Sequence, residues 1–281
     1  MSPLKIETHI KVQSAELDAA SLLAEDTGLS KQNIKQAMQK GAVWHSHGKQ
    51  TNRLRRAKKP LKAGDELHLY YNQAVLDEVV TAPELLFDQG QYSIWYKPFG
   101  VRCQGSKWSD HTTINRFAET HLDPARSAYI IHRLDLAASG LIVLGHSKKV
   151  TAAIAHLFET RALNKFYQVI VEGKFPEGNI TIDTDVDNKS ALSHAHILEY
   201  NHELNQSKVQ VKIESGRKHQ IRIHMASLGH PVVGDRQHGN GSDNTPNLQL
   251  TSCHLSFICP LSGEHKVFEL PQHYRPEFQL K

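Results

Sequence analysis

Short apolar segments separated by polar turns dominate the chain from Leu85 onward. They are typical of β-strands, and they comprise YSIWYKP (92–98), AYIIH (128–132), GLIVLG (140–145), KFYQVIVEG (165–173), SKVQVKIES (207–215) and CHLSFICP (253–260). Apolar positions at helical spacing are fewer and predict one helix after Lys148 and another after the segment GRKHQ (216–220). Many strands with a few helices among them predict an α+β fold with a mixed, largely antiparallel sheet.

The N-terminal quarter has a different pattern. A helix is predicted to begin after Ser30, a suitable N-cap, and to stop at Gly41, and an earlier helix is expected over Ala15–Glu25. Strands are predicted at AVWH (42–45) and ELHLYY (66–71). We therefore expect a small α/β domain over residues 1–76, joined by the linker NQAVLDEVVTAPELL to a larger domain over residues 77–281.

A basic segment, KQTNRLRRAKKPLK (49–62), lies between the two predicted strands of the small domain and contains no acidic residue. Two interpretations are open. It could be a solvated loop, or it could contact phosphates, with Arg53, Arg55 and Arg56 as candidate ligands.

Charge and composition narrow the class of protein. The 281 residues are 39% hydrophobic and 22% charged, with a net charge of +4, which is typical of a soluble globular protein. Residues 1–76 hold 12 Lys and Arg against 7 Asp and Glu, so the excess positive charge is N-terminal and points mildly to a polyanionic partner. No window is apolar enough for a membrane span or a signal peptide, and we expect a cytosolic protein.

Cysteine and histidine give no sign of a disulfide framework or a metal site. The three cysteines show no CxxC spacing, and the 19 histidines show no converging set of ligands. Reduced thiols and the absence of a metal are therefore expected.

The segment YIIHRLDLAASGLIVLG (129–145) places Asp135 inside an apolar run. An ionised carboxylate in such a place needs a cation and hydrogen bonds. Arg133 is one candidate, since both side chains would share a face in an extended strand. Arg222, which lies between Ile221 and Ile223, is the other. A structural salt bridge and a catalytic pair both fit this pattern.

Four segments together resemble the RluA family of pseudouridine synthases, and they occur in the order of that family. They are IWYKPFGV (94–101), HRLDLAASGL (132–141), NKFYQVIVEG (164–173) and GRKHQIRIHMASLGHPVVGD (216–235). Residues 14–72 also resemble the αL RNA-binding domain first known from a ribosomal protein, although Lys31, Lys35 and Lys40 replace the usual arginines of its second helix.

The resemblance implies a role for each matching residue. Asp135 matches the catalytic aspartate, Arg222 matches the arginine paired with it, and Tyr167 matches the tyrosine that stacks on the target uracil. Arg133 matches the arginine that enters the space of the flipped-out base. Ala138 departs from the family, which commonly has Thr there, so one hydrogen bond of this loop is in question.

The resemblance implies an RNA uridine isomerase, and the residues are consistent with it. Isomerisation needs no redox step, and the chain has neither a P-loop nor GxGxxG, so we expect no cofactor. Ribosomal RNA of the large subunit is the preferred substrate and transfer RNA the second, with no obligatory protein partner. The alternatives are an RNA-binding protein without activity and a hydrolase using Ser139, which lacks the GxSxG elbow. Tyr167 could also be a plain core residue.

Overall fold

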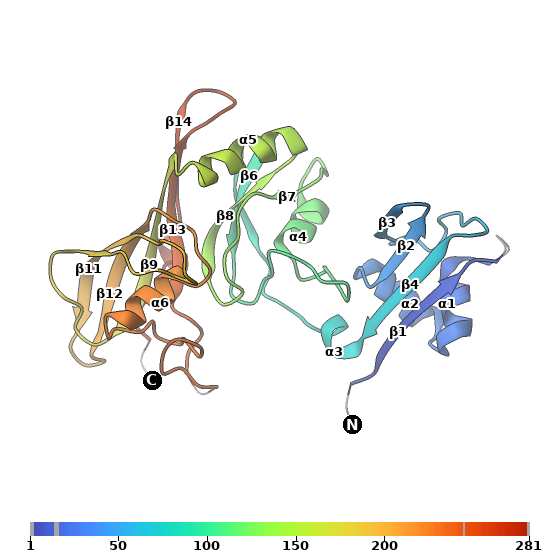
Figure 1. Cartoon of the computed structure of the whole chain (residues 1–281), viewed down its shortest axis with the longest axis horizontal. Coiled ribbons are helices and arrows are strands. Elements are labelled where there is room, and N and C mark those ends of the chain that lie inside the picture. Colours follow the sequence, from blue (N-terminus) through green and yellow to red (C-terminus); the bar gives the residue numbers. More distant parts are fainter. Residues whose placement is uncertain (1–2, 14–16, 244, 280–281) are drawn as a thin grey trace. The chain divides into compact units, whose positions relative to one another are not determined.

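The computed structural model describes residues 3–13, 17–243 and 245–279, and the chain forms two compact units (Figure 1). Unit 1 comprises the residues up to Val80 together with Gln104–Phe117, and unit 2 comprises Thr81–Cys103 and the residues from Ala118 onward. Unit 1 therefore takes up a segment that the sequence analysis assigned to the larger domain. Within the described residues, no helix has the length and hydrophobicity needed to cross a membrane.

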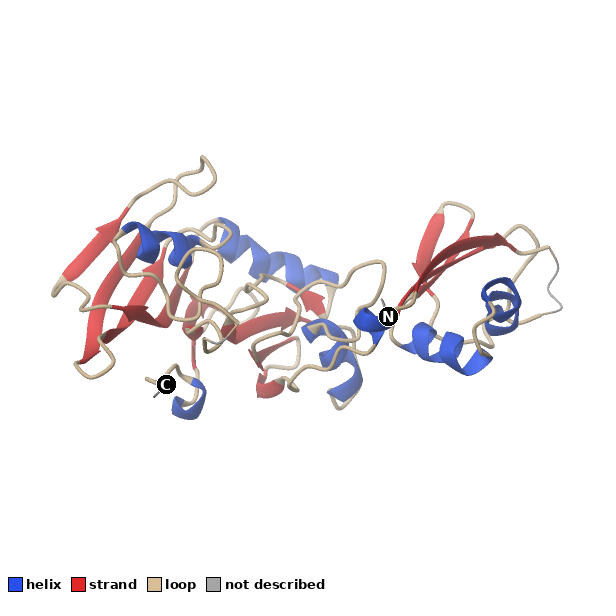
Figure 2. Cartoon of the chain, turned by 90° about the horizontal axis from the view of Figure 1, so that it is seen from below, coloured by secondary structure: helices blue, strands red, loops and turns tan. Residues whose placement is uncertain are grey.

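Unit 1 contains a four-stranded antiparallel sheet and short helices. The strand order is β1 (Lys5–Lys11), β4 (Glu66–Asn72), β2 (Val43–His47) and β3 (Gln50–Arg53), and the helices are α1 (Ala19–Thr27), α2 (Lys31–Gln39) and α3 (Gln73–Leu76). Helices α1 and α2 lie on one face of the sheet (Figure 2). Alternate residues of the strands, such as Leu67 and Leu69, are fully buried in the core on that side, as expected for strands of period two.

The predicted helix signals of unit 1 are largely confirmed. Ser30 caps α2, its hydroxyl accepting a hydrogen bond from the backbone N–H of Asn33 at 3.1 Å. The helix ends at Gln39, just before Gly41, whose φ is +84°. The earlier helix begins at Ala19, later than predicted, and Ala15 lies outside the described residues.

Unit 2 is built on a ten-stranded mixed sheet, which confirms the predicted α+β class. Its main path runs β10 (Asn179–Ile182), β11 (Ser193–Asn201), β12 (Gln206–Ile213), β9 (Leu163–Glu172), β13 (Leu250–Ile258), β8 (Ser139–Gly145), β6 (Tyr92–Lys97) and β5 (Glu84–Asp88), with β14 (His265–Glu269) on β13 and β7 (Tyr129–Ile130) on β8. Among the described strands only β13 and β8 pair in parallel. The helices are α5 (Lys148–Glu159), α6 (Gln220–Ser227) and a 3₁₀ turn at Gln272–Tyr274. Helix α4 (Ile114–His121) begins in unit 1 and ends in unit 2.

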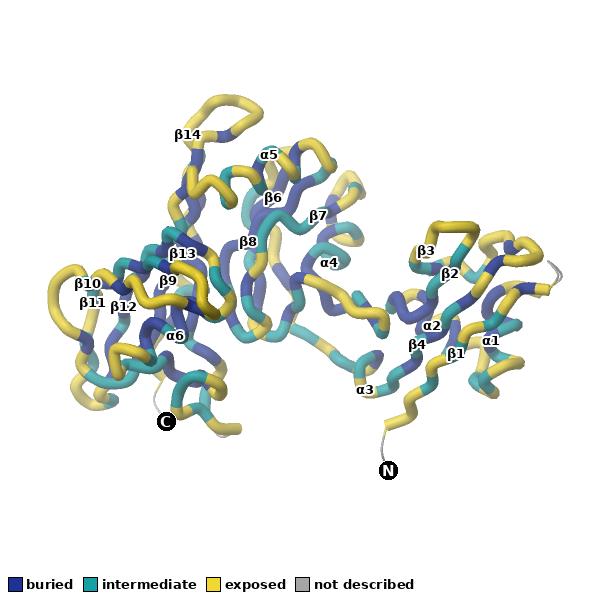
Figure 3. Tube along the Cα trace, in the orientation of Figure 1, coloured by how far each residue is buried: buried dark blue, intermediate teal, exposed yellow. Residues whose placement is uncertain are grey.

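The centre of this sheet is the most buried part of unit 2 (Figure 3). Helix α5 packs against β8 and β7, and its Ile154 is fully buried in a cluster with Leu141 and Val143. Where β8 meets β13, a Cβ on Gly140 would lie 2.3 Å from the carbonyl oxygen of Ser252, and Gly140 has a φ of +110°. Only glycine fits there, which explains the Ser-Gly-Leu sequence after the Asp135 segment.

Candidate active site

Asp135 lies in the loop between β7 and β8, and its side chain is 25% exposed. The flanking apolar residues form the two strands, as predicted, but residues 132–138 are loop and turn. Asp135 and Arg133 therefore do not share a strand face, and this part of the sequence interpretation was wrong. The apolar flanks fix the ends of a loop that presents the carboxylate, so the carboxylate itself is not buried within a strand.

Three backbone and thiol contacts hold this loop. The N–H of Ala138 donates to the carbonyl of Asp135 at 3.1 Å, and the N–H of Gly100 donates to the carbonyl of Leu136 at 2.9 Å. Cys103 lies 3.4 Å from both the N–H and the carbonyl oxygen of Leu134. The segment after β6 thus fixes the residues on both sides of Asp135.

Lys97, at the end of β6, is fully buried and organises that segment. Its ammonium donates to the carbonyls of Pro98 at 3.1 Å and Val101 at 3.0 Å. Burial lowers the pKa of Lys97 to about 8, although Cys103 and Asp135 oppose the shift. The IWYKPFGV segment therefore supports the Asp135 loop through a buried cation.

His132 has a structural role in the same loop. Its Nε2 accepts a hydrogen bond from the N–H of Val143 at 3.1 Å, and its ring stacks on Phe158 at 4.4 Å. Burial lowers the pKa of His132 to about 3, so the ring is neutral at physiological pH and can act as an acceptor.

Arg222, on α6, is held by Asp235. Its Nε and Nη2 donate to the two carboxylate oxygens of Asp235 at 2.7 and 2.6 Å. The N–H groups of Gln237 and His238 donate to the same carboxylate. Burial alone would raise the pKa of Asp235, but these bonds hold it at about 2. Both charges persist at neutral pH, and the arginine is fixed in one orientation.

The remaining nitrogen of Arg222 faces Asp135. Its Nη1 lies 3.7 Å from Oδ2 of Asp135, an ion-pair distance longer than a hydrogen bond, and Nε2 of His219 lies 3.9 Å from the same oxygen. Burial lowers the pKa of His219, opposed by Asp135, so His219 is largely neutral near pH 7. Arg222 therefore supplies a constant positive charge near Asp135.

Tyr167, on β9, lines a pocket of about 80 Å³ with Asp135, Arg133 and Ala138. The ring is 8% exposed. Burial raises the pKa of the phenol above its usual range, although a hydrogen bond with Ser252 opposes the shift, and the phenol stays protonated. A second pocket of about 300 Å³ adjoins Asp135 and Arg222 on the side of Phe99 and Asp235. The carboxylate thus borders two hollows that can receive a ligand.

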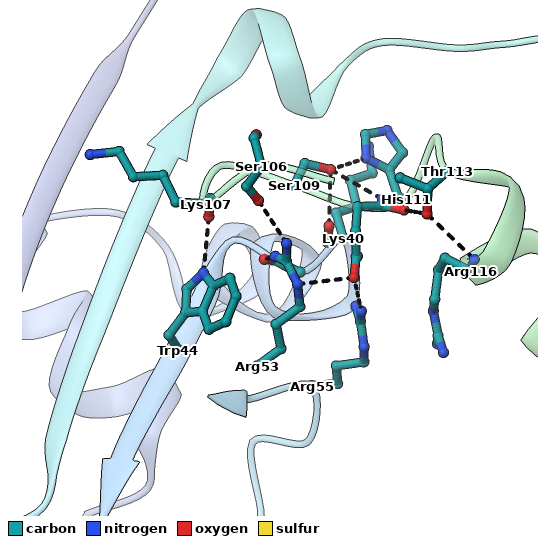
Figure 4. Close-up of polar contacts among 12 residues, drawn as sticks. Lys40, Trp44, Arg53, Arg55, Ser106, Lys107, Ser109, His111, Thr113 and Arg116 are labelled. Atoms are coloured by element: carbon teal, nitrogen blue, oxygen red, sulfur yellow. Dashed lines mark hydrogen bonds and ion pairs between the residues drawn. The ribbon is translucent and has the colours of Figure 1, made fainter. Parts of the chain in front are cut away.

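Two of the three arginines from the basic segment have intramolecular partners within unit 1. Arg53 binds Asp110 at 3.0 Å, and Arg55 also binds Asp110 (Figure 4). Arg53 further donates to the carbonyl of Ser106 at 2.6 Å. Arg56 is exposed. The structure therefore uses Arg53 and Arg55 to attach the segment 104–117, a role that their charge alone did not reveal.

Known proteins match both the sequence and the fold. The family model described as RNA pseudouridylate synthase matches residues 91–227. The dual-specificity RNA pseudouridine synthase RluA of Haemophilus influenzae is 32% identical over 154 residues, which cover 49% of this chain and 70% of that protein. The chain belongs to the RluA-type RNA pseudouridine synthases. It is an isomerase, as predicted.

Further relatives support this family assignment. An uncharacterised RNA pseudouridine synthase of Aquifex aeolicus is 26% identical over 277 residues, covering 86% of each chain. The solved structure of human RNA pseudouridylate synthase domain containing 1 shares the fold, with a TM-score of 0.59, 22% identity, and coverage of 73% of this chain and 93% of that one.

Two residues of this pseudouridine synthase were not singled out from the sequence as parts of the site. Asp235 ends the segment HPVVGD. A carboxylate directly after apolar residues is the same kind of pattern that singled out Asp135. Lys97, in the segment IWYKPFGV, has two interpretations from the sequence, as a residue that lines the site or as part of a strand-ending turn, and the turn is the plainer one. It does end β6, but its burial beside the Asp135 loop depends on tertiary packing.

Proposed function

We propose that Asp135 is the catalytic carboxylate of this isomerase, that Arg222 keeps it ionised, and that Tyr167 stacks on the extruded uracil. The observation that carries the proposal is the position of Asp135 between the other two side chains: it lines one hollow with Tyr167 and lies 3.7 Å from Arg222, which lines the adjoining hollow. Arg133, which lines the hollow with Tyr167, is proposed to contact the substrate.

The reaction makes specific demands on the carboxylate. The bond between ribose C1′ and uracil N1 breaks, a bond from C1′ to C5 forms, the C5 proton leaves and N1 gains a proton. An ionised Asp135 can start this as a nucleophile on the sugar or as a base that removes a ribose proton. The two routes differ in one measurable way: deuterium at ribose C2′ slows the base route and leaves the nucleophile route unchanged.

Arg222 is proposed to favour the ionised state of the Asp135 carboxylate. Nε and Nη2 of Arg222 donate to Asp235, and its third nitrogen, Nη1, lies 3.7 Å from Asp135. We expect a fixed cation at that distance to favour the charged carboxylate. Substituting Arg222 with Met should therefore lower turnover, and wild-type turnover would refute this role.

The pocket beside Tyr167 is the proposed place for a base that has left its stack. Flipping costs a few kcal/mol, and stacking on an aromatic side chain returns about 1–3 kcal/mol. Tyr167→Phe should still bind RNA, whereas Tyr167→Ala should bind or turn over poorly. Equal activity of both variants would contradict stacking.

The proposed substrate is structured RNA in the cytosol, with large-subunit ribosomal RNA preferred over transfer RNA. Positive charge in the N-terminal quarter supports a structured polyanion. One relative, from Zymomonas mobilis, is named ribosomal large subunit pseudouridine synthase D and is 29% identical over 177 residues. The relative from Haemophilus influenzae is named dual-specificity, and this keeps transfer RNA as the second candidate.

A single experiment tests both the substrate and the catalytic residue. Pseudouridines are mapped in total RNA from cells that lack the protein, and the cells are then supplied with wild-type or Asp135→Asn protein. A site that wild type restores and Asp135→Asn does not restore supports the proposal. Because Asn keeps the size of the side chain, the variant should fold and bind RNA normally. Restored modification by the variant would end the assignment of Asp135.

A further inference from the structure

The outer face of the unit 1 sheet, which points away from α1 and α2, is not a plain hydrophilic surface. Along β1 and β4 the outward positions alternate with buried ones and include Lys5, His9, His68 and Tyr70. Trp44 of β2 points the same way, since it pairs in register with His68. An exposed sheet face usually carries flexible polar side chains, so four neighbouring aromatic or imidazole rings there need an explanation.

Residues 106–108 add another aromatic side chain, Trp108, and a cation, Lys107, to this face. The ring of Trp108 meets that of Tyr70 edge to face at 5.9 Å. The indole N–H of Trp44 donates to the carbonyl of Lys107 at 3.0 Å (Figure 4). The ammonium groups of Lys5 and Lys107 lie 4.8 and 5.0 Å from the Trp108 ring. The result is a cluster of aromatic rings with lysines among them.

This combination suits one kind of polymer. Bases stack on aromatic side chains regardless of sequence, while lysines attract the phosphates between them. Unit 1 holds 14 Lys and Arg against 10 Asp and Glu, a difference of +4, which equals the net charge of the whole chain. Glu7 pairs with Lys107 at 2.7 Å, but both side chains are exposed. Such a pair is weak, so a phosphate can replace the carboxylate.

The basic segment is the competing surface, and its geometry is less suitable. Arg53 and Arg55 are committed to Asp110 and to backbone carbonyls. Their guanidinium groups would have to give up these bonds before they could bind phosphate. On the sheet face, a base that stacks on Trp108 has to displace only the flexible side chains of Lys5 and Lys107, whose ammonium groups lie over that ring.

We propose that the outer face around Trp108, Tyr70 and Lys5 binds a single-stranded stretch of the RNA substrate by base stacking. The inference rests on the proposed function, because it supposes that this isomerase acts on structured RNA containing unpaired segments. The proposed contact lies on the sheet face of unit 1, opposite the helices. It involves the bases of the RNA as well as its phosphates.

The test measures binding of the full-length protein to a labelled single-stranded oligouridylate of about 12 nucleotides, a length within the usual range of such sites. Trp108→Ala should weaken binding by about tenfold, and Trp108→Phe should stay within about twofold of wild type because it keeps a stacking ring. Lys5→Ala, at an exposed position, should reduce the slope of log affinity against log salt by about 0.7, the value for one phosphate of a single strand.

Lys149→Ala is the matched control, since Lys149 is an exposed lysine of helix α5 in unit 2. It should change neither affinity nor salt slope as much as Lys5→Ala does. The proposal is overturned if Lys149→Ala has the larger effect, if both lysine variants have equal effects, or if Trp108→Ala binds like wild type. The last result would leave the face to a different partner, such as a protein.

Failure of this inference can be told apart from failure of the proposed function. Binding of the oligouridylate and formation of pseudouridine are measured separately, and neither Trp108 nor Lys5 lines the hollows beside Asp135. If the wild type forms no pseudouridine, the proposed function fails while the binding result stands. If pseudouridine forms normally and Trp108→Ala binds normally, only the stacking surface is refuted.

Discussion

Asp235 lies outside the proposed pair of Asp135 and Arg222, yet we expect it to affect both stability and turnover. It is 1% exposed and neutralises Arg222, which is 6% exposed. Removing one partner of a buried pair leaves the other charge without compensation, at a cost of about 3–5 kcal/mol. Asp235→Asn should lower the free energy of unfolding by that amount and also reduce turnover, because Arg222 loses its fixed orientation.

Urea unfolding and turnover measure these two effects of Asp235→Asn. Asp243→Asn is the control, because Asp243 is fully exposed and lies 3.9 Å from Arg236. An exposed pair contributes little, so this variant should resemble wild type. Equal stability of the two variants would mean that Arg222 does not depend on Asp235.

Lys97 gives a prediction for pH. Its pKa is about 8 in the folded chain against an ordinary value of 10.5. Between these values the unfolded chain binds more protons, so the contribution of Lys97 to the free energy of unfolding rises with pH there, by on the order of 3 kcal/mol in total. Below about pH 8 both states are protonated and the contribution stops changing.

Unfolding of wild type and Lys97→Met should therefore be compared at pH 8, 9 and 10. The difference in free energy of unfolding, wild type minus variant, should increase across this series. The same series with Lys149→Met, at an exposed lysine of α5, should give a constant difference. A constant difference for Lys97→Met as well would show that the buried ammonium titrates normally.

At the scale of elements, the end of α2 is coupled to the segment 104–117. A Cβ on Gly41 would lie 2.3 Å from the Oδ1 of Asp110 and 2.9 Å from the Nη1 of Arg53. Gly41→Ala should thus cost the strain of a positive φ and also push Asp110 away. Gly48 has a φ of +58° with nothing within 4 Å of the same added atom, so Gly48→Ala costs the backbone strain alone.

The two glycine variants separate these effects in thermal or urea unfolding. Gly48→Ala should cost about 1–2 kcal/mol, and Gly41→Ala should cost about 1–3 kcal/mol more, as for overpacking. Hydrogen exchange should also become faster at residues 106–111 in Gly41→Ala only. Similar exchange in both variants would show that Asp110 accommodates the extra carbon without releasing the segment.

The elements also show where sequence patterns suffice and where they fail. Strands β6, β8, β9, β12 and β13 were predicted because their apolar runs are long and bounded by turns. Strands β10, β11 and β14 were not singled out, since segments such as SHAHILEYN carry little apolar signal at a sheet margin. Asp135 was singled out because it is a carboxylate inside an apolar run of the sequence. Its loop conformation depends on Gly100 and Cys103, which no local pattern connects to it.

At the scale of the whole molecule, the chain passes from unit 1 to unit 2, returns to unit 1 at residues 104–117 and leaves again. Local periodicity cannot reveal such a return, because it depends on contacts such as those of Asp110 with Arg53 and Arg55. The predicted boundary between residues 76 and 77 stays a prediction, and its experimental use needs care. A deletion of residues 1–76 would remove the bonding partners of Asp110 along with any RNA contacts.

Limited proteolysis with trypsin shows the consequence of this arrangement. In the full-length protein, the carbonyl of Lys107 accepts a hydrogen bond from Trp44, and that of Ser106 accepts one from Arg53. In a chain that begins at Thr81 these partners are gone, so cleavage after Lys107 should become faster by an order of magnitude or more, as for a loop that opens freely. Cleavage after Lys189, in an exposed turn of unit 2, should proceed at the same rate in both chains. If Lys107 is equally protected in the shortened chain, the segment 104–117 keeps its conformation without unit 1, and loss of RNA binding on truncation can then be attributed directly to residues 1–76.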